Sequence, residues 1–336
     1  MNDERDQAIG EYLWDRSGDP DPEIVRLETM LGPLRHQGKP PQLPRRPQRF
    51  GRVAIAAMSA AAALLLLVAT AWFVLTARGG WDVRRMAGLP VVDGETVSGE
   101  GRLHIGAWLV TNAVSRARIK VGRIGEVDVD PDTRVQLVEA RGREHRLALE
   151  RGTIHARIWA PPKFFYVNTP SATAIDLGCA YTLQVDDSGA GLLRVTSGWV
   201  GFERHGREAY IPKGAVCVTR PGIGPGTPYF DDAPSGYGQA LMVLDFEAAK
   251  DPRRAAALEL VLSRARKRDG LTLWHLLTRG SPDERARVFD RLAVLAPPPR
   301  GVTRDAVLRG ERPALAQWWD VLGVDTDTWW RLWKKW

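Results

Sequence analysis

Cysteine and histidine are the residue types in this chain that could ligate a metal ion or act as a catalytic nucleophile and base. The 336 residues contain 2 cysteines and 6 histidines. No two histidines lie three or four positions apart, the spacing that brings two ligands to one face of a helix. His36 has no cysteine near it. We therefore expect no metal site, and we interpret the later histidines as surface or hydrogen-bonded side chains: His104, His145, His155, His205 and His275.

Catalytic motifs are also missing from the sequence. There is no nucleophile elbow, no HExxH helix and no phosphate-binding loop with its lysine. The glycine-rich run 222–226 lacks both that lysine and the strand-to-helix context of such a loop. The sequence thus predicts a protein that is not an enzyme, with no catalytic residue and no cofactor.

A charge-free apolar run from Val53 to Ala77 is the most prominent element of the chain. Its twenty-five residues, at about 1.5 Å each in a helix, exceed the roughly 30 Å hydrocarbon core of a bilayer. A buried soluble helix and a cleaved signal peptide are the alternatives. A signal peptide has a shorter apolar region and does not follow fifty-two residues. We predict one transmembrane helix at 53–77.

The charges on either side of this run predict its direction. Residues 35–52 contain six bases and no acid, whereas only Arg78, Arg84 and Arg85 follow the run over a similar distance. The positive-inside rule then places the N-terminus in the cytoplasm and the C-terminus in the periplasm of a bacterial inner membrane. A basic block beside an apolar run indicates contact with membrane lipid rather than nucleic acid, and no nucleic-acid-binding motif is present.

The two cysteines, Cys179 and Cys217, both fall in the part predicted to be periplasmic. In that oxidising compartment a disulfide between them is plausible. Two buried thiols are the alternative, because the sequence gives no distance between the two residues.

The cytoplasmic segment 1–36 is predicted to hold two short amphipathic helices, at 3–14 and 22–35. Asp21 suits the N-cap of the second helix, and Pro22 suits its first turn. Two such helices cannot bury a stable core alone, so we expect their apolar faces to bind a partner. A loosely ordered tail without a partner is the alternative. A Pro/Arg-rich linker, 37–52, follows. The expected partner-binding residues are Ile9, Tyr12, Leu13, Leu27 and Leu31.

Apolar residues alternate with polar ones over 95–220, which predicts an all-antiparallel β domain, a roll or a sandwich. One pattern recurs: an apolar residue, two residues, glycine, one residue, then two alternating apolar residues. The pattern contains Gly152, Gly198 and Gly214. We interpret each glycine as allowing a tight turn between two strands.

Four motifs in this domain resemble those of the FecR-type regulators. They are Leu149–Gly152, Val167–Pro170 with Thr169 and Pro170, Gly178–Leu183, and Val195–Val200. Cys179 stands where threonine is usual. The resemblance implies a transmembrane signal transducer of the anti-sigma-factor type. Its periplasmic β domain would sense a periplasmic or outer-membrane protein, and its cytoplasmic segment would regulate an extracytoplasmic-function sigma factor. The chain lacks the histidine and cysteine zinc signature that some anti-sigma factors carry.

Beyond a Gly/Pro-rich linker at 221–238, helical spacing returns and predicts an all-α bundle over 239–336. Asp251 with Pro252 marks one helix start, and the capping box Ser281–Glu284 marks another. The chain ends in an aromatic and basic cluster. This cluster either completes the core of the bundle or docks on a partner or a membrane: Trp329, Trp330, Arg331, Trp333, Lys334, Lys335 and Trp336.

A second function stays open on this sequence. The same parts suit a membrane-anchored envelope-binding protein that holds peptidoglycan, a polysaccharide or a protein without signalling. The cytoplasmic helices distinguish the two functions, because an anchor alone does not need them.

Overall fold

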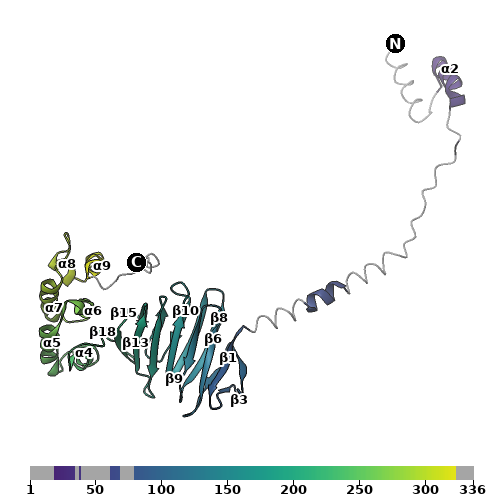
Figure 1. Ribbon diagram of the computed structural model, residues 1–336. Helices are drawn as coiled ribbons and strands as arrows, with labels where there is room; N and C mark the ends of the chain where they lie inside the picture. Colours follow the sequence, from purple (N-terminus) through teal and green to yellow (C-terminus); the bar gives the residue numbers. More distant parts are fainter. Residues whose placement is uncertain (1–18, 35–37, 39–60, 69–78, 323–336) are drawn as a thin grey trace. The chain divides into compact units, whose positions relative to one another are not determined.

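The computed structural model describes residues 19–34, 38, 61–68 and 79–322, and the chain divides into two units, residues 1–70 and 71–336 (Figure 1). In the first unit, helix α2 spans Pro22–Leu31 and a 3-10 turn, η1, follows at Gly32–Leu34. The Asp21 side chain accepts a hydrogen bond from the backbone N–H of Glu23 at 2.8 Å. The predicted cap and the proline in the first turn are therefore confirmed. The other predicted helix, 3–14, lies outside the described residues.

The predicted span Val53–Ala77 is described only at 61–68, where the chain is helical and its side chains are exposed. Among the residues that the structure describes, no helix combines the length and apolar character needed to cross a membrane. The rest of the predicted span, and the linker 37–52 apart from residue 38, lie outside the described residues.

Residues 80–230 of the second unit form strands in two layers that share one strand, β9. The first layer has the order β4-β1-β6-β7-β9-β12-β13-β16, with β17 and β18 paired to β16. The second has the order β3-β2-β5-β8-β9-β10-β11-β14-β15. The strands are β1 Gly80–Ala87, β2 Val91–Val92, β3 Glu95–Thr96, β4 Glu100–His104, β5 Trp108–Val110, β6 Arg116–Val121, β7 Gly125–Val129, β8 Arg134–Arg141, β9 Glu144–Ile158, β10 Phe165–Asn168, β11 Thr173–Asp176, β12 Ala180–Val185, β13 Gly191–Ser197, β14 Trp199–Arg204, β15 Arg207–Pro212, β16 Ala215–Arg220, β17 Gly224–Pro225 and β18 Tyr229–Phe230.

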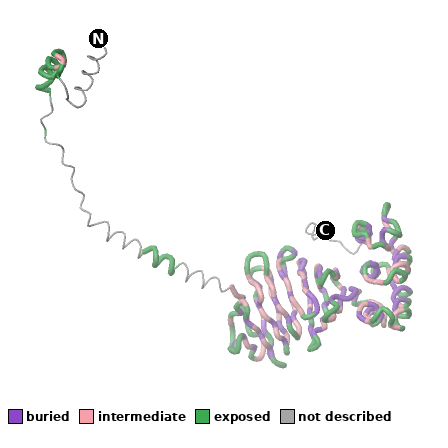
Figure 2. Tube along the Cα trace, turned by 180° about the vertical axis from the view of Figure 1, so that it is seen from behind, coloured by how far each residue is buried: buried purple, intermediate pink, exposed green. Residues whose placement is uncertain are grey.

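The core lies between the layers, because alternate residues of most strands are buried (Figure 2). In β6, for example, Ala117, Ile119 and Val121 are buried while their neighbours are not. The ring of Trp81 in the first layer lies 6.4 Å from the ring of Phe165 in the second. The apolar residues of the alternating sequence pattern therefore face this shared core, and the polar residues between them face solvent.

The strand region differs from the sequence prediction at two places. β10 pairs with the first half of β9 in parallel, so the domain is not all-antiparallel. Strand β1 begins at Gly80, before the predicted start at residue 95, and it pairs with both β4 and β6. Only two side chains of β1, Trp81 and Val83, are buried. The alternation of apolar and polar residues is therefore too short to identify this strand from the sequence.

The segment 221–238, predicted as a linker, contains β17 and β18 and buries residues 224–228. Asp245 of the following helix explains this packing. Its carboxylate accepts hydrogen bonds from the Thr227 backbone N–H at 2.6 Å and from the Thr227 hydroxyl at 3.0 Å. The same carboxylate pairs with Arg207 of β15 at 2.8 Å and with Arg279 at 3.4 Å.

Helices follow over 237–321 and pack at the β15 end of the layers (Figure 1). The predicted capping box at Ser281 and Glu284 is confirmed. All eight residues of α6 are buried. The helices are α4 Tyr237–Phe246, α5 Arg253–Arg264, α6 Gly270–Leu277, α7 Pro282–Leu295, α8 Arg304–Leu308 and α9 Arg312–Val321, with a 3-10 turn, η2, at Lys267–Asp269.

Helix α6 and the residues just after it close the free edge of β15, the last strand of the second layer. The His275 ring accepts a hydrogen bond at Nε2 from the Tyr210 backbone N–H, at 3.1 Å. Arg279 donates to the Glu208 carbonyl at 2.6 Å. An unpaired strand edge is a template for pairing with other chains, so these two side chains protect it. The strands and the helices form one compact unit.

Candidate functional site

The two predicted disulfide partners are free, buried thiols, so the proposed disulfide is wrong. Cys217 lies opposite Leu193 of β13, whereas Cys179 packs against Gly198 just beyond the end of that strand. Five residues of strand, at about 3.3 Å each, separate these positions by roughly 16 Å, far beyond the reach of a disulfide.

Burial also makes the two thiols unreactive. It raises the pKa of Cys179 well above its usual value, and it raises the pKa of Cys217 to about 12. The Cys179 thiol donates to the Asp176 carboxyl group at 2.6 Å, and the Cys217 thiol donates to the Gly226 carbonyl at 3.2 Å. Because the thiolate is the reactive form, neither cysteine is placed for nucleophilic chemistry.

Two of the histidines, His155 of β9 and His275 of α6, hold other parts of the fold through both ring nitrogens. His155 bridges the Thr182 hydroxyl and the Asp130 carboxylate at 2.9 and 2.8 Å. Nδ1 of His275 donates to the Leu271 carbonyl, which leaves Nε2 to accept from Tyr210. In the described part of the chain, no group of three or more His, Cys, Asp or Glu side chains is arranged to hold a metal ion.

The motif glycines mark places where the chain passes from one layer to the other. Residues 144–151 of β9 pair in the second layer and residues 152–158 in the first. Gly152 therefore lies within a continuous strand, and the prediction of a turn there is wrong. The same passage occurs at Gly178, Gly198 and Gly214. All four have positive φ, between 68 and 97°.

Two of these crossings show why glycine is needed. A Cβ at Gly152 would lie 2.3 Å from the Thr133 hydroxyl oxygen, and a Cβ at Gly198 would lie 2.0 Å from the Gly178 carbonyl oxygen. Thr169 and Pro170 belong to a turn instead: the Thr169 hydroxyl accepts from the Ala172 N–H and donates to the Ala172 carbonyl. The motif residues therefore shape the fold.

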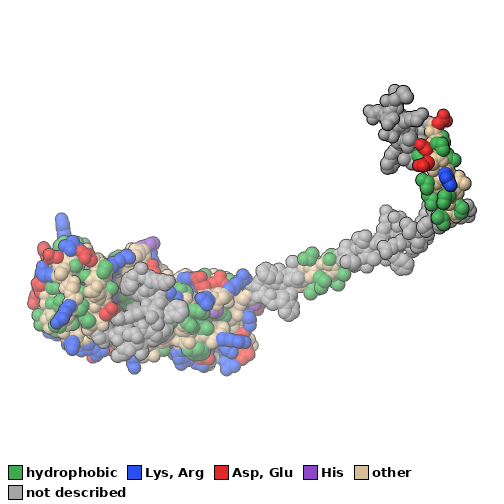
Figure 3. All heavy atoms as spheres, turned by 90° about the horizontal axis from the view of Figure 1, so that it is seen from above, with side chains coloured by type: hydrophobic (Ala, Val, Ile, Leu, Met, Phe, Trp, Pro, Cys, Tyr) green, Lys and Arg blue, Asp and Glu red, His purple; other side chains and the backbone are tan. Residues whose placement is uncertain are grey.

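Of the predicted partner-binding residues, Leu27 and Leu31 lie on α2, while Ile9, Tyr12 and Leu13 lie outside the described residues. Leu27, Met30, Leu31 and Leu34 form the α2 apolar face, with exposed fractions between 57 and 78%. Figure 3 shows hydrophobic side chains over much of the visible surface of α2. No residue of this helix is buried.

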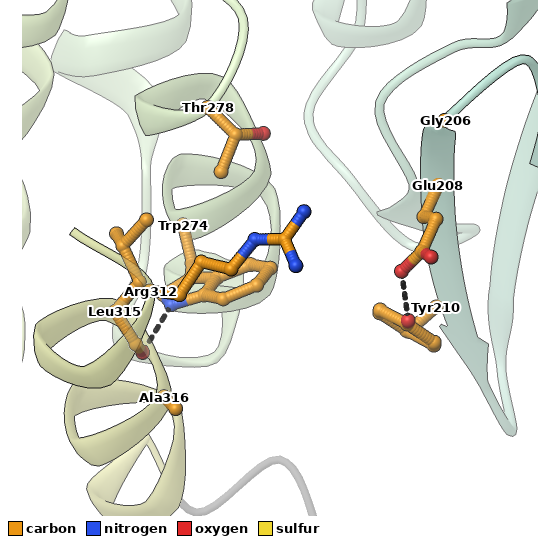
Figure 4. A pocket seen from close by; sticks show the side chains of 8 residues that line it. All are labelled: Gly206, Glu208, Tyr210, Trp274, Thr278, Arg312, Leu315 and Ala316. Atoms are coloured by element: carbon orange, nitrogen blue, oxygen red, sulfur yellow. Dashed lines mark hydrogen bonds between the residues drawn. The ribbon is translucent and has the colours of Figure 1, made fainter. Parts of the chain in front are cut away.

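A pocket of about 220 Å3, the β15 pocket, lies between β15 and helices α6 and α9 (Figure 4). Arg312 at the start of α9 points across it towards Glu208 and Tyr210, and Trp274 forms part of its wall. The Tyr210 hydroxyl donates to the Glu208 carboxylate, and the Trp274 indole donates to the Leu315 carbonyl at 2.9 Å. One cation, one anion and two aromatic rings can hold a small group of mixed polarity.

A larger and more open groove of about 470 Å3, the layer groove, lies on the outer face of the second layer. The Arg146 guanidinium stacks over the Tyr166 ring at 4.5 Å and also pairs with Glu144 at 2.7 Å. Arg204 donates to the Pro170 carbonyl at 2.6 Å. Its Nε is buried without a hydrogen-bond partner. The groove is lined by Arg146, Tyr166, Thr169, Ala172, Thr173, Ile175, Glu203, Arg204 and His205.

Sequence reasoning missed both cavities. Tyr210, Trp274 and Arg312 come from three elements far apart in the chain, and no local pattern connects them. Of the groove residues, Arg146, Tyr166, Thr173 and Ile175 are outward members of alternating strands, which the sequence pattern assigns only to the surface. The terminal cluster at 329–336 lies outside the described residues.

Comparison with known proteins gives only partial likenesses, all to solved structures. No family model matches the chain. No curated protein matches it either. Two crystal structures of a candidate anti-sigma factor from Parabacteroides distasonis are similar in fold over part of the chain, each with a TM-score of 0.33. The first is 14% identical and covers 40% of this chain, and this chain spans 64% of its length. The second is 13% identical and covers 47% of this chain, and this chain spans 73% of its length.

Proposed function

We propose that this chain is a membrane-anchored signal transducer that regulates a sigma factor. In this proposal, segment 1–36 holds the sigma factor in the cytoplasm, and residues 53–77 span the membrane. The unit of strands and helices senses a periplasmic or outer-membrane protein. The observation that carries the proposal is the α2 apolar face, whose leucines are exposed on a well-capped helix.

The energetics favour a partner for this face. Burial of apolar surface contributes about 25 cal/mol per Å2, so covering four large side chains recovers a few kcal/mol before the cost of ordering the segment. Glu23 and Glu28 lie on the same helix as the apolar face. Their charge favours approach of a basic, DNA-binding partner.

The strand and helix unit supports the sensing half of the proposal. It has its own core, its free strand edge at β15 is closed, and it carries two cavities on its surface. A rigid body with surface pockets suits recognition of another molecule better than catalysis, because both cysteines, His155 and His275 are engaged in the fold.

Co-purification of the full chain from its native organism tests the proposal. We expect the tagged chain, extracted in mild detergent at low salt, to retain a sigma factor identified by mass spectrometry. Leu27→Asp and Leu31→Asp place a charge on the α2 apolar face, so each should reduce retention at least tenfold.

Thr29→Asp is the matched control, because it adds the same charge to the opposite side of the helix. This variant should retain the sigma factor as the unmodified chain does. Equal loss in all three variants would show a general effect of charge. Absence of any sigma factor would leave the signalling function without support.

The layer groove favours a second candidate, an anchored envelope-binding protein without signalling. A stacked arginine and tyrosine beside threonine and glutamate side chains are groups that bind sugars and peptides. Retention of peptidoglycan fragments by the full chain, lost in Tyr166→Ala and without any sigma factor, would favour this candidate.

A further inference from the structure

One end of the strand layers carries exposed basic and aromatic side chains that no interaction described so far uses. We name it the Gly79 end, and it is formed by the loops around residues 104–106, 122–124, 141–145 and 159–164. The Ile105 N–H donates to the Gly79 carbonyl at 3.2 Å. The Trp159 N–H donates to the Ile124 carbonyl, and the His145 N–H donates to the Phe164 carbonyl, each at 2.9 Å.

The charge of this end is positive. Arg123, Arg143 and Lys163 come from three different loops, are exposed, and make no ion pair within the described part of the chain. Glu144, an acid of the same end, is paired with Arg146 at 2.7 Å. The Glu139 carboxylate accepts from the Ala140 N–H at 3.0 Å. The unpaired charges that face solvent here are therefore mainly basic.

Trp159 supplies an apolar group at the same end, beside Arg123. Its side chain is 64% exposed, yet its indole N–H donates to the Arg123 carbonyl at 3.1 Å. The ring is therefore held in place rather than free to fold back against the protein. A fixed, exposed tryptophan among basic side chains has the composition of a surface that meets the interface between membrane and water.

We propose that the Gly79 end docks on the bilayer, with Trp159 in the headgroup region and its basic side chains on anionic phospholipid headgroups. This inference rests on the proposed membrane anchor. The predicted span ends at Ala77, and two residues reach at most about 7 Å. Gly79 would then lie close to the membrane surface, so docking costs little translational freedom.

A lipid surface suits this end better than a soluble ligand. Neither the β15 pocket nor the layer groove includes any of Arg123, Trp159 or Lys163, and these exposed residues come from separate loops. Separate loops that each contribute an exposed base at one end of the layers match a plane of headgroups better than a single small molecule.

Reconstitution of the full chain into nanodiscs tests the docking. The readout is the rate of acetylation of Lys163, measured by mass spectrometry, in discs of phosphatidylcholine with and without phosphatidylglycerol. We expect Lys163 to react several-fold more slowly in the anionic discs. The rate at Lys250, which is exposed between α4 and α5, should be the same in both.

Paired variants assign the effect to this end. Arg123→Gln with Arg143→Gln should restore the fast rate at Lys163, because it weakens binding to anionic lipid by about fivefold per base removed. Arg264→Gln with Arg300→Gln removes two exposed bases after the strand layers and should leave the protection in place.

The outcomes separate this inference from the anchor on which it rests. Incorporation into discs with equal Lys163 rates in both lipids would overturn the docking alone. Failure to incorporate would overturn the anchor and the docking together. Protection by a soluble polyuronate but not by phosphatidylglycerol would assign the surface to an acidic glycan and overturn the lipid proposal.

Discussion

Helices α2 and α6 are both short and leucine-rich, yet none of the ten residues of α2 is buried and all eight residues of α6 are. Helix α6 packs beside β15, where His275 and Trp274 contact Tyr210 and the helices around them. No element among the described residues packs over the leucines of α2 in this way. The same residue types thus form a core in one place and an exposed face in the other.

This difference shows what helical spacing of apolar residues can and cannot tell. The spacing predicts that one face of a helix is to be covered. It does not say whether the chain itself supplies the cover. Where another element does so, the leucines belong to the core, and where none does, the face is available to a partner.

The largest expected effect comes from truncating a buried side chain, and the comparison is with an exposed side chain of α2. Trp318 of α9 is fully buried, its indole donates to the Ala296 carbonyl at 3.0 Å, and its ring lies 5.0 Å from Phe289. We expect Trp318→Ala to lower the free energy of unfolding by about 3–5 kcal/mol. Leu27→Ala on α2 should change it by less than about 0.5 kcal/mol. Urea denaturation followed by tryptophan fluorescence measures both, and a similar loss in both variants would show that α2 is covered after all.

Burial in the strand layers also changes the pKa of a carboxyl group. The resulting pH dependence of stability is the next largest expected effect. Burial raises the pKa of Asp176 from 3.8 to about 7. Between these two values the folded chain keeps a proton that the unfolded chain has released. A rise in pH through this window therefore favours unfolding, and the loss is complete above about pH 7. From pH 5 to pH 8 the expected loss is about 3 kcal/mol, because the window spans about two pH units at about 1.4 kcal/mol each.

Asp176→Asn cannot ionise and should not show this loss. Its free energy of unfolding relative to the unmodified chain should rise by about 3 kcal/mol between pH 5 and pH 8. Asp186→Asn is the control, because hydrogen bonds from Ser188 hold the pKa of that exposed acid below its usual value. Its difference from the unmodified chain should be the same at both pH values. A parallel shift in the two variants would argue against burial as the cause.

The sequence predicted the strands better than their connections. Ala117, Ile119 and Val121 alternate because β6 has one buried face, and that pattern is local. The role of Gly152 is not local. A glycine with positive φ allows a turn or a passage between layers equally well, and only the pairing partners of β9 distinguish the two. The parallel pairing of β10 with β9 is likewise a property of residues distant in the chain.

The candidate sites divide in the same way. Leu27 and Leu31 could be identified from their spacing on one helix, and both are exposed there. The β15 pocket could not, because Tyr210, Trp274 and Arg312 meet only after the helices have packed on the strands. The disulfide prediction was wrong for the same reason. A predicted shared compartment says nothing about the distance between Cys179 and Cys217.

The smallest expected effect concerns the stability of α2 itself. A helix that nothing covers depends on its own caps, since isolated helices of this length are marginal in water. The Asp21 side chain accepts from the Glu23 N–H at 2.8 Å, and loss of such a cap costs about 1 kcal/mol. We expect Asp21→Ala to speed hydrogen exchange in peptides covering 22–34 by about fivefold, while peptides from 79–322 exchange as before. Asp19→Ala removes a nearby charge without the cap and should have a much smaller effect. If Asp21→Ala leaves the exchange of α2 unchanged, then packing holds this helix, and the contrast with α6 disappears.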